Sequence, residues 1–283
     1  YPDDVDATVA YVAPHSLQAG DPRYDAWFDE TLPADCLARV RAFQVDLLSI
    51  RRGAMVARAT AEAADAGYVY DRVALGAAVE SSIVDIEWAY FQYVGVEYCD
   101  QLPAASETDD DYVYQWLGFI SAPSGLDDDS IELFEPYYYQ AAAELGYPAT
   151  AQPHLDGLKQ YSDEDYAGIN PVDLEGPIVY DDATMIDVGD WVREDADHTI
   201  FLYGEYDPWS GGSFDLGDNP ELHRYVVPQG THGADLVALP TAERDEAFAL
   251  LAAWMGVTPV IPPSQSRRRE LTPPREPRLL RGW

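Results

Sequence analysis

The sequence predicts an α/β fold in which a helical cap interrupts the sheet-forming part of the chain. Residues 5–12 (VDATVAYV) are rich in β-branched and aromatic side chains, a composition typical of a buried strand. Two further apolar runs, residues 199–203 and 224–227, end at Gly204 and Pro228 and predict strands near the other end of the chain. Helical and aromatic sequence lies between these ends, as expected of one α/β domain with an insertion.

The long middle region is predicted to be mainly helical at its start. Residues 35–66 predict one long helix, and residues 73–93 carry apolar and aromatic side chains at helical spacing. Residues 100–168 show no sustained periodicity, so we expect an irregular segment there. Two acidic clusters within it, at 109–111 and 127–129, are typical of solvated helix starts, because acidic side chains stabilise the positive end of a helix.

A last helix is predicted over residues 241–253, ending near Gly256. Beyond it the sequence is rich in proline and arginine without periodicity, so we expect a disordered or extended tail. The predicted division is therefore a core of residues 1–45 and 170–256, a cap of residues 46–169, and a tail of residues 257–283.

Charge is the most unbalanced property of the chain. Its 51 acidic residues outnumber its 17 basic residues, giving a formal net charge of −34, and Lys159 is the single lysine. Such a surface repels nucleic acids and anionic membranes, and no run of about 18 uncharged apolar residues could span a bilayer. Neither partner is therefore expected. The imbalance reflects either a coding bias toward aspartate and arginine or adaptation to high salt, in which screening weakens self-repulsion.

The two cysteines, Cys36 and Cys99, match no metal-ligand spacing, and no metal or cofactor is expected. In an exported protein they would form a disulfide, whereas in a cytosolic protein they would be small buried apolar side chains. The disulfide is the favoured interpretation.

Two motifs after the late strands carry side chains suited to catalysis. Asp207 follows Gly204 and precedes a proline, and His232 lies in the segment Gln-Gly-Thr-His-Gly. Both positions come just beyond the carboxyl end of a predicted strand, where α/β sheets place their active sites. An acid followed by a histidine on successive late strands is the order that α/β-hydrolases show after their serine. Asp207 would then orient the imidazole of His232, which takes a proton from the nucleophile and returns it to the leaving group.

Each motif alone has a simpler interpretation, because Asp-Pro after a strand can be a turn and a histidine between glycines can be a loop residue. Their combination in this order favours catalysis. The remaining histidines lack such a context and are interpreted as surface or packing residues: His15, His154, His198 and His223.

A serine nucleophile is not evident in the sequence. The Gly-x-Ser-x-Gly elbow places its serine on a strained strand-to-helix turn, and Ser121, Ser124 and Ser210 all lack that frame. The sequence begins at Tyr1, without a methionine or a signal segment, so we expect it to start inside a longer protein or after processing. The elbow is expected before Tyr1, and this chain alone is expected to be inactive.

Several segments, taken in order, resemble the secreted prolyl tri- and tetrapeptidyl aminopeptidases of actinobacteria. They are residues 1–14, Phe91 to Tyr93, Tyr98-Cys99, Pro136 to Gln140, Tyr203 to Trp209 and Thr231 to Ala234, within a resemblance that extends to about Gly256. The resemblance implies an exported serine exopeptidase that needs no cofactor and removes short peptides from free N-termini, preferring cleavage after proline. It also implies an α/β-hydrolase fold that is incomplete here, because the N-terminal strands and the nucleophile elbow are missing. The missing N-terminal segment would then be a partner of this chain.

An exopeptidase of this kind must recognise a free ammonium group and a proline. A buried or half-buried carboxylate best recognises the ammonium, and we expect this of Glu80, Glu87 or Glu205, although a solvated helix face explains the first two equally well. A proline side chain requires a small pocket with aromatic walls. The residues expected around the substrate are Tyr90, Phe91, Gln92, Tyr93 and Trp209, of which the stripe at residues 90–93 could instead be plain core.

Two other functions fit the same motifs. An esterase or lipase of this fold is an alternative because a triad alone does not distinguish esters from amides, and it would be indifferent to a blocked substrate N-terminus. A non-catalytic, hydrolase-like binding protein is the other alternative, motivated by the missing serine.

Overall fold

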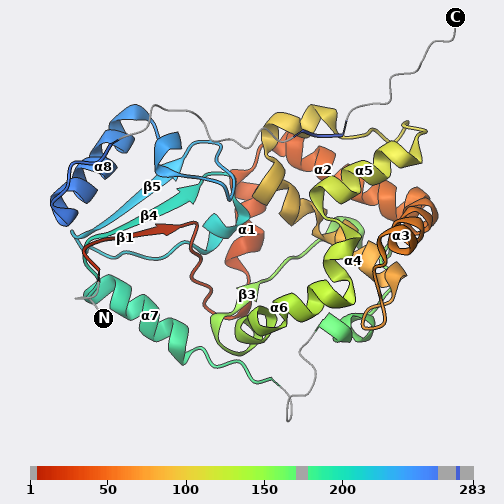
Figure 1. Ribbon diagram of the computed structural model, residues 1–283, viewed down its shortest axis with the longest axis horizontal. Coiled ribbons are helices and arrows are strands. Elements are labelled where there is room, and N and C mark those ends of the chain that lie inside the picture. Colours follow the sequence, from red (N-terminus) through yellow and green to blue (C-terminus); the bar gives the residue numbers. More distant parts are fainter. Residues whose placement is uncertain (1–4, 170–177, 261–271, 275–283) are drawn as a thin grey trace, which may run out of the picture.

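The computed structural model describes residues 5–169, 178–260 and 272–274. A parallel sheet flanked by two helices forms one side of the molecule, and a helical assembly forms the other (Figure 1). The strands are β1 (Thr8–Tyr11), β2 (Ala19–Asp21), β3 (Tyr147–Pro148), β4 (Thr199–Gly204) and β5 (Leu222–Val227). The α-helices are α1 (Arg23–Thr31), α2 (Ala34–Asp46), α3 (Arg52–Ala66), α4 (Leu75–Ala89), α5 (Asp110–Ile120), α6 (Asp128–Gln140), α7 (Ala183–Glu194) and α8 (Thr241–Met255).

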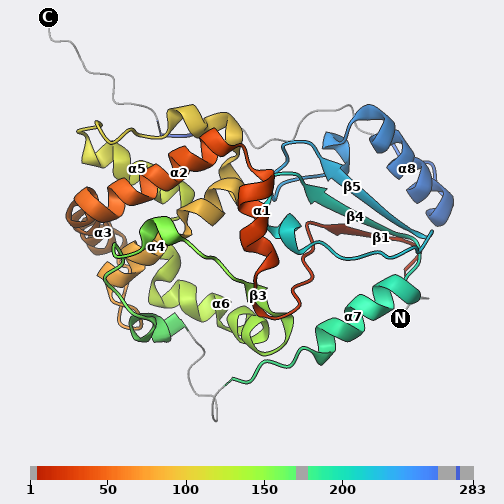
Figure 2. The ribbon, with the colours of Figure 1, turned by 180° about the vertical axis from the view of Figure 1, so that it is seen from behind.

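The main sheet has the order β1-β4-β5, and both pairings are parallel. Every residue of β4 is buried, because helices cover both faces of this central strand. Ile200 and Leu202 lie in a cluster with residues of α8, whereas Phe201 and Tyr203 lie in a cluster with residues of α7. This alternation follows from the two-residue period of a strand. Figure 2 shows α7 and α8 on opposite sides of the sheet.

The three strands predicted for this sheet are confirmed, with shifted bounds. The first is shorter than residues 5–12, since β1 begins at Thr8. The other two extend the predicted ranges to residues 199–204 and 222–227. A second, two-stranded parallel sheet, β2-β3, joins the chain before α1 to the segment after α6 and was not predicted.

The helical side has its own apolar core, which contains residues of α1, α2, α3, α4 and α5. The long helix predicted over 35–66 is confirmed as α2 and α3, joined by a π-helical turn at Leu47–Arg51. The helix predicted over 73–93 is α4 followed by a second π-helical turn, Tyr90–Val94. Because α1 and α2 pack in this core, they lie with the helical side. The division of the chain after residues 45 and 169 remains a prediction.

The expectation of an irregular segment over residues 100–168 is wrong, because α5 and α6 lie within it. The interpretation of the two acidic clusters as helix starts is confirmed. Asp109 caps α5 by accepting hydrogen bonds from the backbone N–H groups of Asp111 and Tyr112, and Asp127 caps α6 by accepting from that of Ser130. These caps satisfy amide groups that have no partner within the helix.

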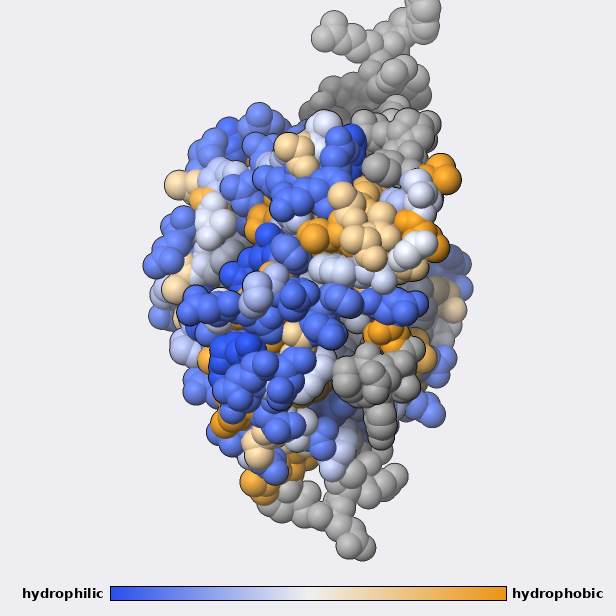
Figure 3. All heavy atoms as spheres, turned by 90° about the vertical axis from the view of Figure 1, so that its left-hand side faces the viewer, coloured by the Kyte–Doolittle hydropathy of each residue, from blue (hydrophilic) through white to orange (hydrophobic). Residues whose placement is uncertain are grey.

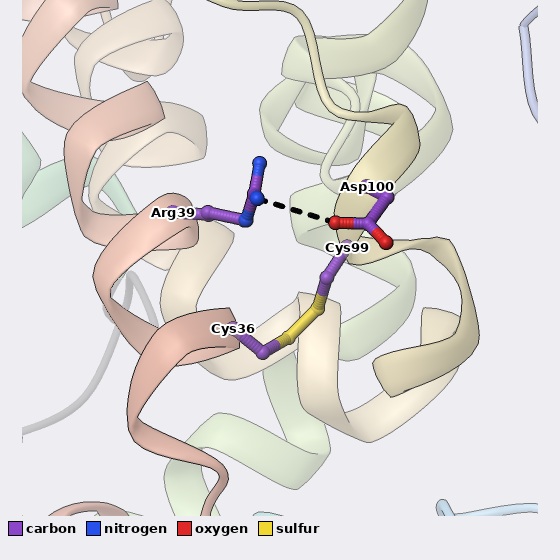
Figure 4. The surroundings of a disulfide bond; sticks show 4 residues. All are labelled: Cys36, Arg39, Cys99 and Asp100. Atoms are coloured by element: carbon purple, nitrogen blue, oxygen red, sulfur yellow. Dashed lines mark ion pairs between the residues drawn. A yellow bond between two sulfur atoms is a disulfide. The ribbon is translucent and has the colours of Figure 1, made fainter.

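Cys36 and Cys99 form a disulfide, with their Cα atoms 5.5 Å apart. The bond joins α2 to the short 3₁₀ helix Val96–Gln101, and both cysteines are buried (Figure 4). Arg39 and Asp100 form an ion pair of 3.3 Å beside it, but both side chains are largely exposed, so the pair adds little stability. The disulfide is therefore the stronger of these two links.

The last predicted helix is confirmed as α8, which ends at Met255 and is followed by Gly256 in a left-handed conformation. The tail expected to be disordered lies mostly outside the described residues. Within the part of the chain that the structure describes, no helix combines the length and apolarity needed to cross a membrane. Hydrophilic residues dominate the face shown in Figure 3, as the composition of the chain suggests.

Candidate active site

The candidate acid is positioned by the loop that follows β4. Asp207 lies three residues beyond Gly204 and begins the 3₁₀ helix Pro208–Gly212. Its Oδ1 accepts a hydrogen bond of 3.3 Å from the backbone N–H of Trp209, and its side chain has no solvent exposure. This buried turn leaves Oδ2 to bind a second partner.

The candidate histidine is positioned by the loop that follows β5. Because β4 and β5 are parallel neighbours, their carboxyl ends share one edge of the sheet. The two loops are joined by a hydrogen bond of 2.8 Å from the backbone N–H of Tyr206 to the carbonyl of Gly230. A Cβ atom at Gly204 would lie 2.4 Å from the Thr231 carbonyl oxygen, so a glycine is required for this close approach.

Helical residues hold the histidine loop from its other side. The backbone N–H of His232 donates to the carbonyl of Gln92 over 2.9 Å, and Gln92 belongs to the π-helical turn after α4. The imidazole therefore lies where the sheet edge meets the helical assembly.

Asp207 and His232 form a hydrogen-bonded pair. The imidazole Nδ1–H donates to Oδ2 of Asp207 over 2.9 Å, and the His232 side chain is 32% exposed. Burial raises the pKa of Asp207 above its ordinary value, and the hydrogen bond from His232 partly opposes this effect. No residue in the described ranges hydrogen-bonds Nε2 of His232. A buried acid therefore holds the imidazole through Nδ1. The other ring nitrogen, Nε2, is able to exchange a proton with a ligand.

Aromatic rings surround this imidazole. The ring centroid of Tyr93 lies 6.2 Å from that of His232, and the Trp209 centroid lies 6.5 Å from it. Trp88, on α4, packs edge-on against Trp209 at 5.1 Å. These contacts connect α4, the Asp207 loop and the His232 loop in one aromatic wall.

Trp209 also lines a pocket of about 300 Å³. Its lining residues are Ser81, Val84, Asp85, Trp88, Pro148, Thr150, Gln152 and Trp209. Sequence reasoning missed Asp85 and Trp88. Their spacing of three residues on a predicted helix was the available signal, since it places both side chains on one face.

Two of the carboxylates predicted to bind the substrate ammonium, those of Glu80 and Glu87, form ion pairs within the chain itself. Glu80 is fully buried, pairs with Arg52, and accepts hydrogen bonds from the backbone N–H groups of Gln160 and Tyr161. Glu87 pairs with the guanidinium of Arg41 at 2.7 Å. These contacts indicate that both carboxylates stabilise the helical core and are not available to bind a ligand.

The other predicted substrate-binding residues divide into two groups. Gln92, Tyr93 and Trp209 lie beside His232 through the contacts described above, whereas Tyr90 and Phe91 are fully buried in the helical core. Glu205 is half-buried and accepts a hydrogen bond of 2.7 Å from the backbone N–H of Gln229, which has a positive φ of 53°. Its carboxylate therefore shapes the loop that carries His232.

Replacing Glu80 with glutamine is expected to lower the free energy of unfolding by about 3 kcal/mol, because Arg52 would lose its anionic partner in a mostly buried position. Urea unfolding of the variant beside Glu132→Gln, an exposed matched control on α6, measures the loss. A change in preference for substrates with a free N-terminus, at unchanged stability, would contradict the structural role of Glu80.

Over the ranges 5–169, 178–260 and 272–274, no group of three or more histidine, cysteine, aspartate or glutamate side chains could hold a metal ion.

Comparison with known proteins connects this geometry to peptidases. A family model described as PS-10 peptidase S37 matches residues 1–272. The chain is similar to the prolyl tri/tetrapeptidyl aminopeptidase of Streptomyces mobaraensis, with 35% identity over 268 residues that cover 92% of this chain and 55% of that protein. It is also similar to the lysosomal Pro-X carboxypeptidase of Bos taurus, with 32% identity over 111 residues that cover 35% of this chain and 20% of that protein. The chain thus spans about half the length of the first relative and a fifth of the second.

Proposed function

This chain belongs to the PS-10 peptidase S37 family, and we propose that it carries the acid and the histidine of a serine exopeptidase with an α/β-hydrolase fold. The observation that carries the proposal is the 2.9 Å hydrogen bond between Asp207 and His232 at the carboxyl edge of a parallel sheet. The buried acid would hold the imidazole with its proton on Nδ1. Nε2 is then free to act as a base.

The proposed reaction is acyl transfer through a serine. Nε2 of His232 takes the proton of the serine hydroxyl as Oγ attacks the scissile carbonyl carbon, and Asp207 stabilises the imidazolium that forms. The imidazolium then gives its proton to the leaving amine nitrogen as the C–N bond breaks, which leaves an acyl-enzyme. A water molecule hydrolyses this ester, again with His232 as the base, and restores the serine.

We propose that the serine lies on a segment preceding Tyr1. The resemblance between the motifs of this chain and those of the aminopeptidases supports this placement, because the elbow precedes the acid and the histidine in that order. The strand order is consistent with such a segment, since among the described strands of this sheet β1 pairs only with β4. An unpaired parallel edge is suited to receive a further strand.

The proposed substrates are peptides with a free N-terminus, cleaved after a proline to release three or four residues. Support comes from the names of both relatives, which specify proline, and from the aromatic wall formed by Tyr93, Trp88 and Trp209. The disulfide between Cys36 and Cys99 supports export of the protein, since such bonds persist in oxidising compartments.

The full-length polypeptide that contains this chain is expected to hydrolyse the p-nitroanilide of Ala-Ala-Pro at least about tenfold faster than that of Ala-Ala-Ala, because a shaped proline pocket favours the ring. Measurement of kcat/KM on both amides tests this expectation. Turnover of nitrophenyl esters without turnover of either amide would favour an esterase instead. Absence of any hydrolysis would favour a binding protein.

A further inference from the structure

We propose that Asp85 binds the free N-terminal ammonium of the peptide substrate, in the pocket lined by Trp209, whose ring also contacts His232. This inference rests on the proposed peptidase function and assigns the residue that makes the enzyme an exopeptidase. It replaces the roles expected of Glu80 and Glu87, whose carboxylates already have arginine partners.

The charge of the pocket favours a cationic group. Asp85 is the one charged side chain among the residues that line it. The Asp85 side chain is exposed, although burial of its carboxyl group raises its pKa and the hydrogen bond from Ser121 partly opposes this effect. Among the described residues the carboxylate accepts that one hydrogen bond, of 3.0 Å, and forms no ion pair. Ser121 orients the carboxylate without neutralising it, so Asp85 retains the capacity for a charge-assisted hydrogen bond to an ammonium.

A second acceptor lies in the same pocket. The amide nitrogen of Gln152 donates to the carbonyl of Val84 over 2.9 Å and to Oε2 of Glu87 over 3.3 Å. The amide N–H groups are engaged in these bonds, so the remaining hydrogen-bonding atom of Gln152 is its carbonyl oxygen, an acceptor. An ammonium donates three hydrogen bonds and accepts none, which matches a pocket that offers a carboxylate and a carbonyl.

The position of Asp85 suits a substrate that is cleaved a few residues from its N-terminus. Two ring contacts, 5.1 Å from Trp88 to Trp209 and 6.5 Å from Trp209 to His232, lead from the pocket to the imidazole. Their sum sets an upper limit on the distance between the Trp88 and His232 rings, and this limit is of the same order as the roughly 10 Å that three extended residues span. Burial and then the charge of Asp85 raise the pKa of Tyr93, which places this carboxylate near the ring that contacts His232.

The kinetic test compares Asp85→Asn with the wild-type full-length polypeptide on the p-nitroanilides of Ala-Ala-Pro and acetyl-Ala-Ala-Pro. Asparagine keeps the size and the acceptor oxygen but removes the charge. We expect kcat/KM for the free peptide to fall roughly 10- to 100-fold, the scale of one hydrogen bond to a charged group, with little change for the acetylated peptide. Asp187→Asn, an exposed matched control on α7, should leave both values unchanged. An equal loss on both substrates would overturn the proposal.

A binding test separates this inference from the proposed catalysis. Ala-Ala-Pro and acetyl-Ala-Ala-Pro are titrated into the same proteins while tryptophan fluorescence is recorded, because Trp88 and Trp209 line the pocket. We expect the wild type to bind the free peptide roughly 10- to 100-fold more tightly and Asp85→Asn to lose that preference. This result would support the ammonium site even if no amide were hydrolysed. Equal wild-type affinity for the two peptides would overturn it even in an active peptidase.

Discussion

Replacing His232 with alanine in the full-length polypeptide is expected to lower kcat for Ala-Ala-Pro p-nitroanilide by about 10⁴- to 10⁶-fold. The imidazole is hydrogen-bonded through Nδ1 to a fully buried acid, and among the described residues its Nε2 is left for a ligand. Without it, the serine hydroxyl has no proton acceptor and the leaving amine has no proton donor. KM should change little, because alanine at this position removes proton transfer rather than the aromatic wall.

His223→Ala is the matched control for this experiment. His223 lies on the same strand, β5, but near its amino end, where it packs against Trp254 at 5.7 Å. Its removal should leave kcat within about twofold of the wild-type value, since the ring is at the opposite end of the strand from His232. Loss of activity in both variants to the same extent would contradict a specific catalytic role for His232.

Replacing Asp207 with asparagine is expected to lower kcat by about 10⁴-fold without unfolding the protein. The amide oxygen of asparagine can still accept the hydrogen bond from the N–H of Trp209, so the turn is preserved. The amide nitrogen, however, donates where the carboxylate accepted. It would favour the imidazole tautomer with its proton on Nε2, which cannot take a proton from serine.

Asp207→Asn is expected to lower kcat but not the free energy of unfolding at pH 8. Burial raises the pKa of Asp207 in the folded state, so the folded protein holds the Asp207 proton more tightly than the unfolded chain does. The charged carboxylate therefore reduces the free energy of unfolding as pH rises through its folded-state pKa, and this penalty disappears as pH falls below the ordinary aspartate range. Asp207→Asn should equal or exceed the wild-type stability at pH 8, with a difference that shrinks toward pH 4.

Urea unfolding of both proteins at pH 8 and pH 4, together with kcat at pH 8, measures these two effects. A variant that is both less stable at pH 8 and inactive would show that Asp207 is needed for folding. That result would contradict a role confined to holding His232. A variant that keeps more than about a tenth of the wild-type kcat would contradict the catalytic role itself.

The sheet edge and the acid–histidine pair could be predicted because their signals are local in the sequence. An apolar run that ends in glycine identifies β4, and a similar run identifies β5, so the loops that follow them must share one edge of a parallel sheet. The close approach at Gly204, where a Cβ would meet the Thr231 carbonyl, explains why a glycine occurs there. The sequence around each strand end was therefore sufficient to predict that Asp207 and His232 lie near each other.

The roles of the carboxylates could not be predicted in the same way. Glu80 and Asp85 lie five residues apart on α4, and both are acids in an apolar helix. Which of them is neutralised depends on Arg52 and on backbone amides at residues 160–161, which reach Glu80 only through the tertiary fold. Helical periodicity carries no information about such distant partners, so it cannot distinguish the carboxylate that pairs with Arg52 from one that forms no ion pair among the described residues.

The helices α5 and α6 were missed for a related reason. Their stability depends on packing of side chains such as Trp116 and Ile131 against α4 and its neighbours, although the capping aspartates gave a correct indication of where each helix begins. Propensity alone was insufficient, because tertiary packing supplies most of the stability of helices of this length.

A crystal structure of the full-length polypeptide, inactivated with a fluorophosphonate that forms a stable adduct on activated serines, would test the assignment of Asp207 and His232 most directly. We expect one phosphonylated serine, located before Tyr1 in the sequence, with its Oγ about 3 Å from Nε2 of His232. An adduct on a serine that lies outside hydrogen-bonding reach of His232 would contradict it.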